Sequence, residues 1–226
     1  MYLKWKTKKI DDFSDKNIEQ MYDFGFLFGR NGRGQMYQSR SVRIDLNQFS
    51  LSSENRRVIK KNENLQMMAI PLPFDAYHWS IHKMGSTFYS SKFGAGVFTA
   101  NKIKELMTDK DKSNFNIALE YKMSSNDQHS NEPTIGYCIC LETENLLHYS
   151  YPFYNLNNSI GNIGMGMMLK AILYALKHKK RHIYIGTASR PTDSYKLQFS
   201  WLEWFDGEKW NNNIEAIKKI LLETKL

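Results

Sequence analysis

The stretch GNIGMGMMLKAILYALKHKKRHIYIG, residues 161–186, decides the fold because a glycine-rich turn, a long helix and a short strand follow one another in it. Its apolar residues recur three and four positions apart, which is the spacing of one helix face: Met165, Met168, Leu169, Ile172, Leu173 and Leu176. Cationic residues gather at 178–181, where the helix dipole favours positive charge. The closing HIYIG, residues 182–186, predicts a short buried strand.

The residues on either side of this stretch extend the pattern. Three runs before it predict strands: NFNIALEYKM (114–123), TIGYCICLE (134–142) and LLHYSYPFY (146–154). After it, Ile214, Ile217, Ile220 and Leu221 mark an amphipathic helix. We therefore expect a mixed α/β (α+β) fold, with an antiparallel sheet flanked by helices. We also expect two parts, a small basic β-rich N-terminal subdomain over 1–65 and a main domain over 66–226.

The glycine turn at 161–166 is the first candidate for chemistry. Gly161, Gly164 and Gly166 let backbone N–H groups and a helix N-terminus approach an anionic group. An antiparallel run of strands, this turn, a helix and then a strand is similar to the GNAT-type acyltransferase fold, whose equivalent turn holds a pyrophosphate. Glycines also begin helices for packing reasons, so the turn is open to both interpretations.

Composition limits the class of protein. The chain has 226 residues, 42% of them hydrophobic and 14% aromatic, which is enough to bury a core. No apolar run approaches the roughly 18 residues of a membrane span, and no apolar segment follows the basic N-terminus as in a secretory signal. Cys138 and Cys140 lie two apart on an expected strand and are poorly placed to bridge. We expect a reduced, cytoplasmic protein in which both are small buried residues.

Positive charge is concentrated in the first third of the chain. The net charge is +8, of which residues 1–61 carry +6 and the remaining residues +2. Such a basic region suits a polyanion, although lysine-rich surfaces also keep proteins soluble. The run LSSENRRVIKKNE, residues 51–63, predicts a helix on which Arg56 and Lys60, and Arg57 and Lys61, lie four apart. Cations crowded on one side indicate either a solvated face or a bound anion.

Three blocks of sequence carry a family resemblance. The first is SVRIDLNQFSLSSENRRVIKKN, residues 41–62, and the second is YSYPFYNLNNSIGNIGMGMMLKAI, residues 149–172, with the strand HIYIG. The third is the spacing of Tyr195, Lys196, Phe199, Glu203, Gly207 and Trp210. In this order, over residues 25–210, the blocks resemble the arginyl- and leucyl-tRNA–protein transferases. Those enzymes move an amino acid from its tRNA to the N-terminal amine of a protein.

The resemblance implies roles for particular residues. Glu203 is expected to hold the acceptor's ammonium or help take its proton, and Lys196 to steady the oxyanion or the terminal phosphate of the tRNA. Tyr195 completes the predicted catalytic set. Predicted substrate-binding residues are Tyr154, Asn155, Tyr184, Gly164 and Gly166, with the tyrosines stacking on the terminal adenine or bonding its 2′-OH. Predicted contacts with acceptor-stem phosphates are Arg43, Arg56, Arg57, Lys60 and Lys61.

Simpler explanations accompany these roles. Glu203 could pair with Lys196 as a surface ion pair, and Phe199, Trp201 and Trp210 suit a core as well as a binding surface. His78 and His82 could share a helix face, but we see no third ligand and predict no metal site.

The chain also departs from the family's pattern. Members carry a cysteine cluster before the VRI strand that holds a metal or iron–sulfur centre in some of them, whereas residues 37–41 here read YQSRS. We therefore expect neither a metal nor an iron–sulfur cluster, and no cofactor beyond aminoacyl-tRNA as co-substrate. Residues 186–191 and Lys170 also differ from the pattern, which leaves the amino acid and the acceptor open. Two alternatives remain: an acyl-CoA-dependent GNAT N-acetyltransferase, and an inactive tRNA-binding protein of the same fold.

Overall fold

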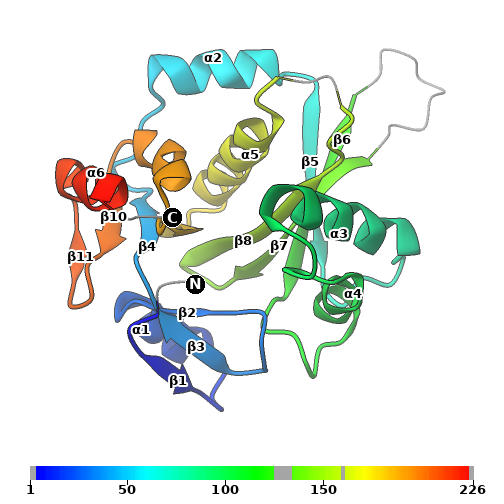
Figure 1. Ribbon diagram of the computed structural model, residues 1–226, viewed down its shortest axis with the longest axis horizontal. Coiled ribbons are helices and arrows are strands. Elements are labelled where there is room, and N and C mark those ends of the chain that lie inside the picture. Colours follow the sequence, from blue (N-terminus) through cyan, green and yellow to red (C-terminus); the bar gives the residue numbers. More distant parts are fainter. Residues whose placement is uncertain (1–3, 125–133, 159–160, 224–226) are drawn as a thin grey trace. The chain divides into compact units, whose positions relative to one another are not determined.

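The chain folds into two compact units that both combine strands and helices. The computed structural model describes residues 4–124, 134–158 and 161–223 (Figure 1). Unit 1 comprises residues 1–52, 142–148 and 175–226, and unit 2 comprises residues 53–141 and 149–174. The predicted mixed α/β fold, with largely antiparallel strands flanked by helices, is confirmed. The predicted boundary between residues 65 and 66 stays a prediction.

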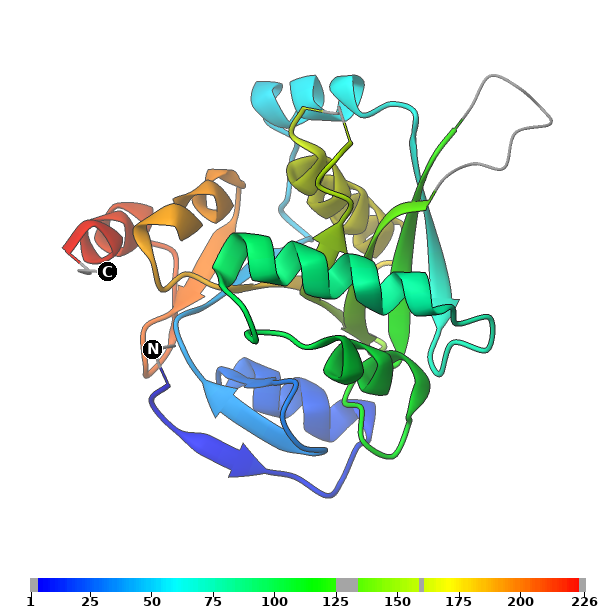
Figure 2. The ribbon, with the colours of Figure 1, turned by 45° about the vertical axis from the view of Figure 1, so that its right-hand side comes forward.

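Unit 1 contains two sets of paired strands. In the first, β1 (Thr7–Lys9), β3 (Gln35–Gln38) and β2 (Phe26–Phe28) pair in that order, with α1 (Asp15–Asp23) beside them (Figure 2). In the second, the order is β11 (Trp210–Asn211), β10 (Leu202–Phe205), β4 (Ser41–Asp45) and β9 (His182–Thr187), all antiparallel. A 3₁₀ helix, η1 (Pro191–Gln198), follows β9, and α6 (Ile214–Glu223) lies against it.

Unit 2 contains the strand order β8 (Leu146–Tyr154), β7 (Thr134–Glu142), β6 (Ile117–Met123) and β5 (Leu65–Pro71). Its helices are α2 (Ser53–Lys61), α3 (Trp79–Phe93), α4 (Ala100–Thr108) and α5 (Ile163–Lys177). Residues at the ends of β7, β8 and α5 belong to unit 1. The predicted strands and the predicted helices over α2, α5 and α6 are confirmed.

The strand register assigns the two faces of the unit 2 sheet. On β6 the neighbours Glu120 and Tyr121 point to opposite faces. The Tyr121 hydroxyl donates to the Met167 carbonyl of α5 at 3.0 Å, so α5 covers its face. On the other face, Glu120 accepts from the Tyr137 hydroxyl at 2.9 Å. A Cβ at Gly85 of α3 would lie 3.3 Å from Phe153, which places α3 against β8.

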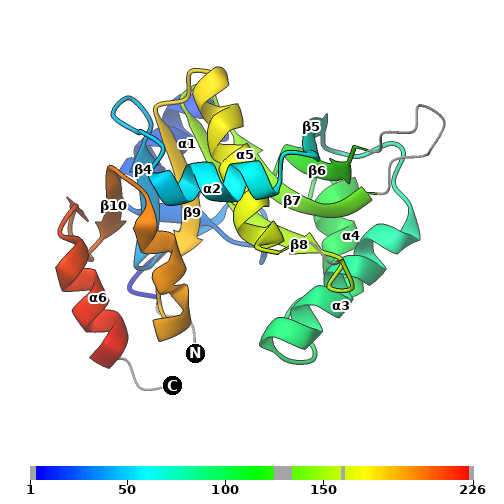
Figure 3. The ribbon, with the colours of Figure 1, turned by 90° about the horizontal axis from the view of Figure 1, so that it is seen from above.

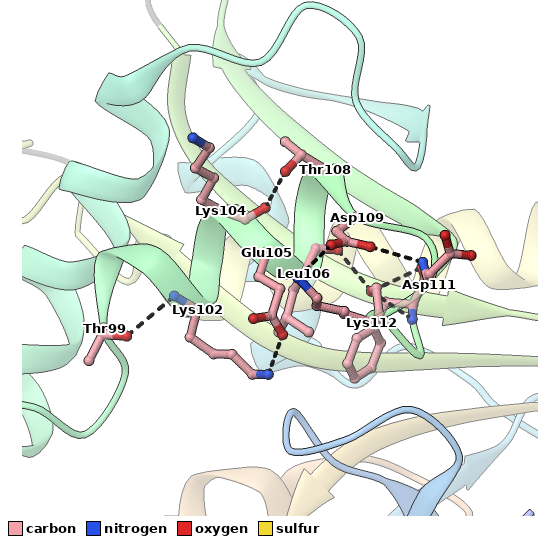
Figure 4. A network of polar contacts seen from close by, with 11 residues as sticks. Thr99, Lys102, Lys104, Glu105, Leu106, Thr108, Asp109, Asp111 and Lys112 are labelled. Carbon is pink, nitrogen blue, oxygen red and sulfur yellow. Dashed lines mark hydrogen bonds and ion pairs between the residues drawn. The ribbon is translucent and has the colours of Figure 1, made fainter.

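Helix α4 is fixed by polar groups at both ends (Figure 4). The Thr99 hydroxyl accepts from the Lys102 backbone N–H at 3.3 Å, and Lys102 pairs with Glu105. Beyond the last turn, Asp109 pairs with Lys112 at 3.1 Å. The Thr99 hydroxyl thus satisfies a backbone N–H at the start of the helix, and the Ser113 hydroxyl donates to the Leu106 carbonyl at its end, at 2.8 Å. None of the helices in the described part of the chain is long and apolar enough to cross a bilayer.

Strands β8 and β9 run parallel to each other. Residues Leu146–His148 of β8 pair in parallel with His182–Tyr184 of β9. Parallel neighbours need a crossover connection, and here the connecting segment includes the glycine-started α5. The strand, glycine turn, helix and strand therefore follow the order expected from the sequence.

Candidate functional site

The predicted site residues are divided between the two units. Unit 1 holds Arg43, Tyr184, Tyr195, Lys196 and Glu203. Unit 2 holds the remaining eight: Arg56, Arg57, Lys60, Lys61, Tyr154, Asn155, Gly164 and Gly166.

In unit 1, Arg43 gathers two carboxylates and a phenol. Its strand β4 lies between β9 and β10, so that Arg43 faces Tyr184 on one side and Glu203 on the other. Its Nε donates to Glu203 Oε2 at 2.7 Å, and its Nη1 donates to Asp23 Oδ1 at 3.0 Å and to the Tyr184 hydroxyl at 3.2 Å. The guanidinium carbon lies 4.1 Å from the centre of the Trp210 ring. The structure thus brings together three predicted site residues: Arg43, Tyr184 and Glu203.

The partners of Arg43 keep its buried guanidinium protonated. Burial by itself lowers the pKa of Arg43, but Tyr184 and Glu203 outweigh it and raise the pKa above the ordinary value. Burial raises the pKa of Tyr184, against the influence of Arg43, so its hydroxyl stays protonated. Because Arg43 is only 8% exposed, its role in binding phosphate stays a prediction that its internal hydrogen bonds do not support.

Lys196 is a second buried cation of unit 1. It lies in η1, is 9% exposed, and donates from Nζ to the Thr187 carbonyl at 2.5 Å. Burial lowers its pKa, while the nearby carboxylate of Asp193 acts in the opposite direction. Tyr195 is 48% exposed, and its ring centre lies 5.7 Å from Lys196 Nζ. A buried amine with a lowered pKa beside an accessible phenol is suited to proton exchange.

Asp193 was not anticipated from the sequence. Burial would raise its pKa, but Lys196, the Ser189 backbone N–H and the Arg190 guanidinium, the last two of which donate to its carboxylate, lower it overall. Asp193 therefore carries a negative charge beside Lys196. The suggested surface pair of Glu203 with Lys196 is wrong, because Glu203 pairs with Arg43 and Lys196 is buried.

In unit 2, α2 presents its cations to solvent. Arg56, Arg57, Lys60 and Lys61 are all exposed, and Glu54 is the helix's one acidic residue, so Ser53–Lys61 carries a net charge of +3. Arg57 is engaged by Glu54 through two hydrogen bonds of 2.7 and 2.5 Å. The pattern is that of a basic, solvent-facing helix.

Close contacts join α2 to the glycine turn. A Cβ at Gly166 would come within 2.6 Å of the buried Asn62, the residue after α2, so the absence of a side chain permits this approach. Figure 3 shows α2 crossing the N-terminal half of α5. A Cβ at Gly164 would lie 3.3 Å from the Tyr154 ring. The basic helix, the first turn of α5 and Tyr154 are therefore contiguous within unit 2.

A pocket of about 220 Å³ lies beside Tyr154. Its lining comes from α3 and from the end of β8: Ser80, Lys83, Met84, Thr87, Phe88, Tyr154, Asn155 and Leu156. The predicted substrate-binding residues Tyr154 and Asn155 thus share one concave site. The α3 residues were missed, although their spacing of three and four positions is the signature of one helix face.

The histidines of this region make local hydrogen bonds. Tyr77 and His82 join hydroxyl to Nδ1 at 3.0 Å, and the His78 ring bonds the Ser80 hydroxyl at 2.9 Å. Among the described residues, no three His, Cys, Asp or Glu side chains are grouped as metal ligands would be.

Comparisons with known proteins find similar structures only. No family model and no curated protein matches the sequence. L-PGS from Bacillus licheniformis matches with 12% identity and a TM-score of 0.49, over 76% of this chain and 52% of that one. The C-terminal domain of a putative lysylphosphatidylglycerol synthetase from Agrobacterium fabrum matches with 9% identity and a TM-score of 0.46, over 81% and 56%.

A GCN5-related glucosamine N-acetyltransferase region of a fungal multi-domain β-N-acetylglucosaminidase matches with 9% identity and a TM-score of 0.47. It covers 87% of this chain and 22% of that one. The chain thus spans about half the length of the first two proteins.

Proposed function

We propose that this protein is an aminoacyltransferase that takes an amino acid from aminoacyl-tRNA and joins it to an amine, in the cytoplasm. The acceptor suggested by the sequence resemblance is the N-terminal amine of a protein or peptide. The ester that links an amino acid to its tRNA is already activated, so the enzyme's main task is to align an amine with the carbonyl carbon.

The observation that carries the proposal is the contiguity of three features in unit 2. The solvent-facing cations of α2 provide contacts for phosphate groups. Asn62 against Gly166 brings the end of that helix to the first turn of α5, whose N-terminus favours negative charge. Gly164 against Tyr154 then leads to the pocket. A basic surface thus leads to a concave site through residues that were predicted to bind the substrate.

The chemical roles of the unit 1 residues belong to the same proposal. Lys196 would stabilise the tetrahedral oxyanion or the terminal phosphate, with Asp193 and the Thr187 carbonyl fixing its position. Glu203, oriented by Arg43, would bind the acceptor's ammonium group. Tyr195, exposed beside Lys196, would contact the substrate.

A transfer assay tests the proposal. Labelled aminoacyl-tRNAs with different amino acids are offered together with peptides that differ in their first residue. Label that appears on peptide supports the proposal. Transfer from acetyl-CoA alone would identify an N-acetyltransferase, and tight tRNA binding without transfer would identify an inactive tRNA-binding protein. Either result would refute the proposal.

Charge-matched variants test the part played by α2. The double variant Lys60→Ala with Lys61→Ala should weaken tRNA binding. The slope of the logarithm of the tRNA association constant against the logarithm of the salt concentration should become shallower by roughly 1 for each phosphate that these lysines neutralise. The control, Lys104→Ala with Lys110→Ala, removes two exposed lysines on or near α4 of the same unit. Equal weakening in both double variants would show that net charge, and not the α2 surface, attracts the tRNA.

A further inference from the structure

The pocket of unit 2 has an apolar floor and a polar rim. Phe88 is buried, and Met84, Tyr154 and Leu156 are partly buried, with the Phe88 and Tyr154 rings 4.7 Å apart. The rim residues are all exposed: Ser80, Lys83, Thr87 and Asn155. A site of this kind favours a ligand with an apolar body and one polar end.

The charge of the lining favours an anion. Lys83 is its one ionic group, because no Asp or Glu is among the eight lining residues. Lys83 Nζ lies 5.3 Å from the ring centre of Trp79, an exposed residue of the same helix. Ser80 lies in the first turn of the 15-residue α3, where the helix dipole adds partial positive charge. The Thr87 hydroxyl and the Asn155 amide provide further hydrogen-bond donors, whereas the Ser80 hydroxyl already bonds the His78 ring at 2.9 Å.

The volume limits the size of the ligand. The pocket volume of about 220 Å³ is below the range of roughly 300–1,000 Å³ typical of pockets for drug-sized ligands. It therefore favours a ligand as small as an amino acid.

We propose that this pocket binds a small organic anion, with its carboxylate or phosphate group at Lys83 and Thr87 and its apolar body against Phe88 and Tyr154. The binding does not depend on the transfer reaction. If the pocket serves that reaction, which rests on the proposed function, the anion belongs to the acceptor, because the donor's carboxyl group is esterified.

Direct binding to the full chain, measured by calorimetry without tRNA, tests this site. The probes are 3-phenylpropanoate, phenyl phosphate and the uncharged 3-phenylpropanamide. We expect the better of the two anions to bind about tenfold more tightly than the amide, as a charge-assisted hydrogen bond requires. Preference for phenylpropanoate or for phenyl phosphate would identify the anionic group.

Variants locate the binding. Lys83→Met should remove the preference for the anion and leave binding of the amide unchanged, whereas Lys92→Met, in the last turn of the same helix, should change neither. Thr87→Val provides a second, nearly isosteric change at the rim and should weaken anion binding several-fold. Equal affinity for anions and amide, or an unchanged preference in Lys83→Met, would overturn the site. If the natural protein binds the anion but shows no tRNA-dependent transfer, the proposed function alone is refuted.

Discussion

The contact between Gly166 and Asn62 gives the sharpest test of how unit 2 is assembled. In Gly166→Ala the new methyl group would lie 2.6 Å from Asn62 Cγ and 3.1 Å from its Cβ, too close for either atom. Asn62 is 2% exposed, and its Nδ2 donates to the Val58 carbonyl at 3.0 Å, so it has little room to move. Overpacking of this kind costs about 1–3 kcal/mol.

Helix propensity acts in the opposite direction, so the comparison needs a matched glycine. Replacing a helical glycine by alanine stabilises by up to about 1 kcal/mol. Gly164→Ala shares that gain, but its methyl group would meet only the Tyr154 ring, at 3.3 Å. Gly166→Ala should therefore be less stable than Gly164→Ala by about 1–3 kcal/mol in denaturant-induced unfolding.

A double variant shows whether Asn62 is the cause. In the background of Asn62→Ala the obstructing amide is gone, so Gly166→Ala should cost less than it does in the natural sequence. The coupling should be about 0.5–3 kcal/mol, as expected for residues in contact. If Gly166→Ala is as stable as Gly164→Ala, or the two changes are additive, the close approach of α2 to α5 is not as described.

Three further predictions concern unit 1 and α2. Glu203→Gln should lower transfer at least about tenfold while leaving tRNA affinity unchanged, and Lys196→Met should lower transfer by a similar factor. If both variants transfer at the rate of the natural protein, the two residues have a structural role only. Burial lowers the pKa of His148 to about 3 from 6.5. Its contribution to stability is therefore complete above pH 6.5 and declines as the pH falls, by about 2 kcal/mol at pH 5. His148→Gln should remove that part of the acid sensitivity, and an equal decline in stability between pH 7 and pH 5 in both proteins would contradict it. Arg57→Ala should reduce the salt dependence of tRNA binding less than Lys60→Ala, because Glu54 already engages Arg57.

The periodicity of apolar residues was sufficient to predict the helices and strands that bury one face or a continuous run of residues. The apolar stripe of α5 and the strand runs of β6, β7 and β8 give clear local signals, and each was predicted. Helix α3 was missed because serine, threonine and Gly85 interrupt its apolar face. What stabilises it is contact with β8 and α4, through Phe153 and Ile103 at Gly85, and such contacts leave no trace in the local sequence.

The sequence was sufficient to predict several residues of the candidate site, but not which side chains contact one another there. Arg43 was identified as functional from its block, but its partners Asp23, Glu203 and Tyr184 come from three other elements. Their meeting depends on strand register, which one sequence does not specify for non-neighbouring strands. The pocket was half predicted, through Tyr154 and Asn155, because its other half belongs to the unpredicted α3.

Not all of the cationic side chains that were predicted to contact tRNA phosphates are accessible to RNA. Arg43 directs its donors inside unit 1, and Arg57 is held by Glu54. Lys60 and Lys61 remain exposed in the last turn of α2, where the helix dipole favours cations even without RNA. Their presence is therefore explained by helix stability alone, and only the salt dependence of tRNA binding separates the two explanations. A slope that falls on removing these two lysines, and holds on removing Lys104 and Lys110, requires phosphate at the end of α2 next to Gly166.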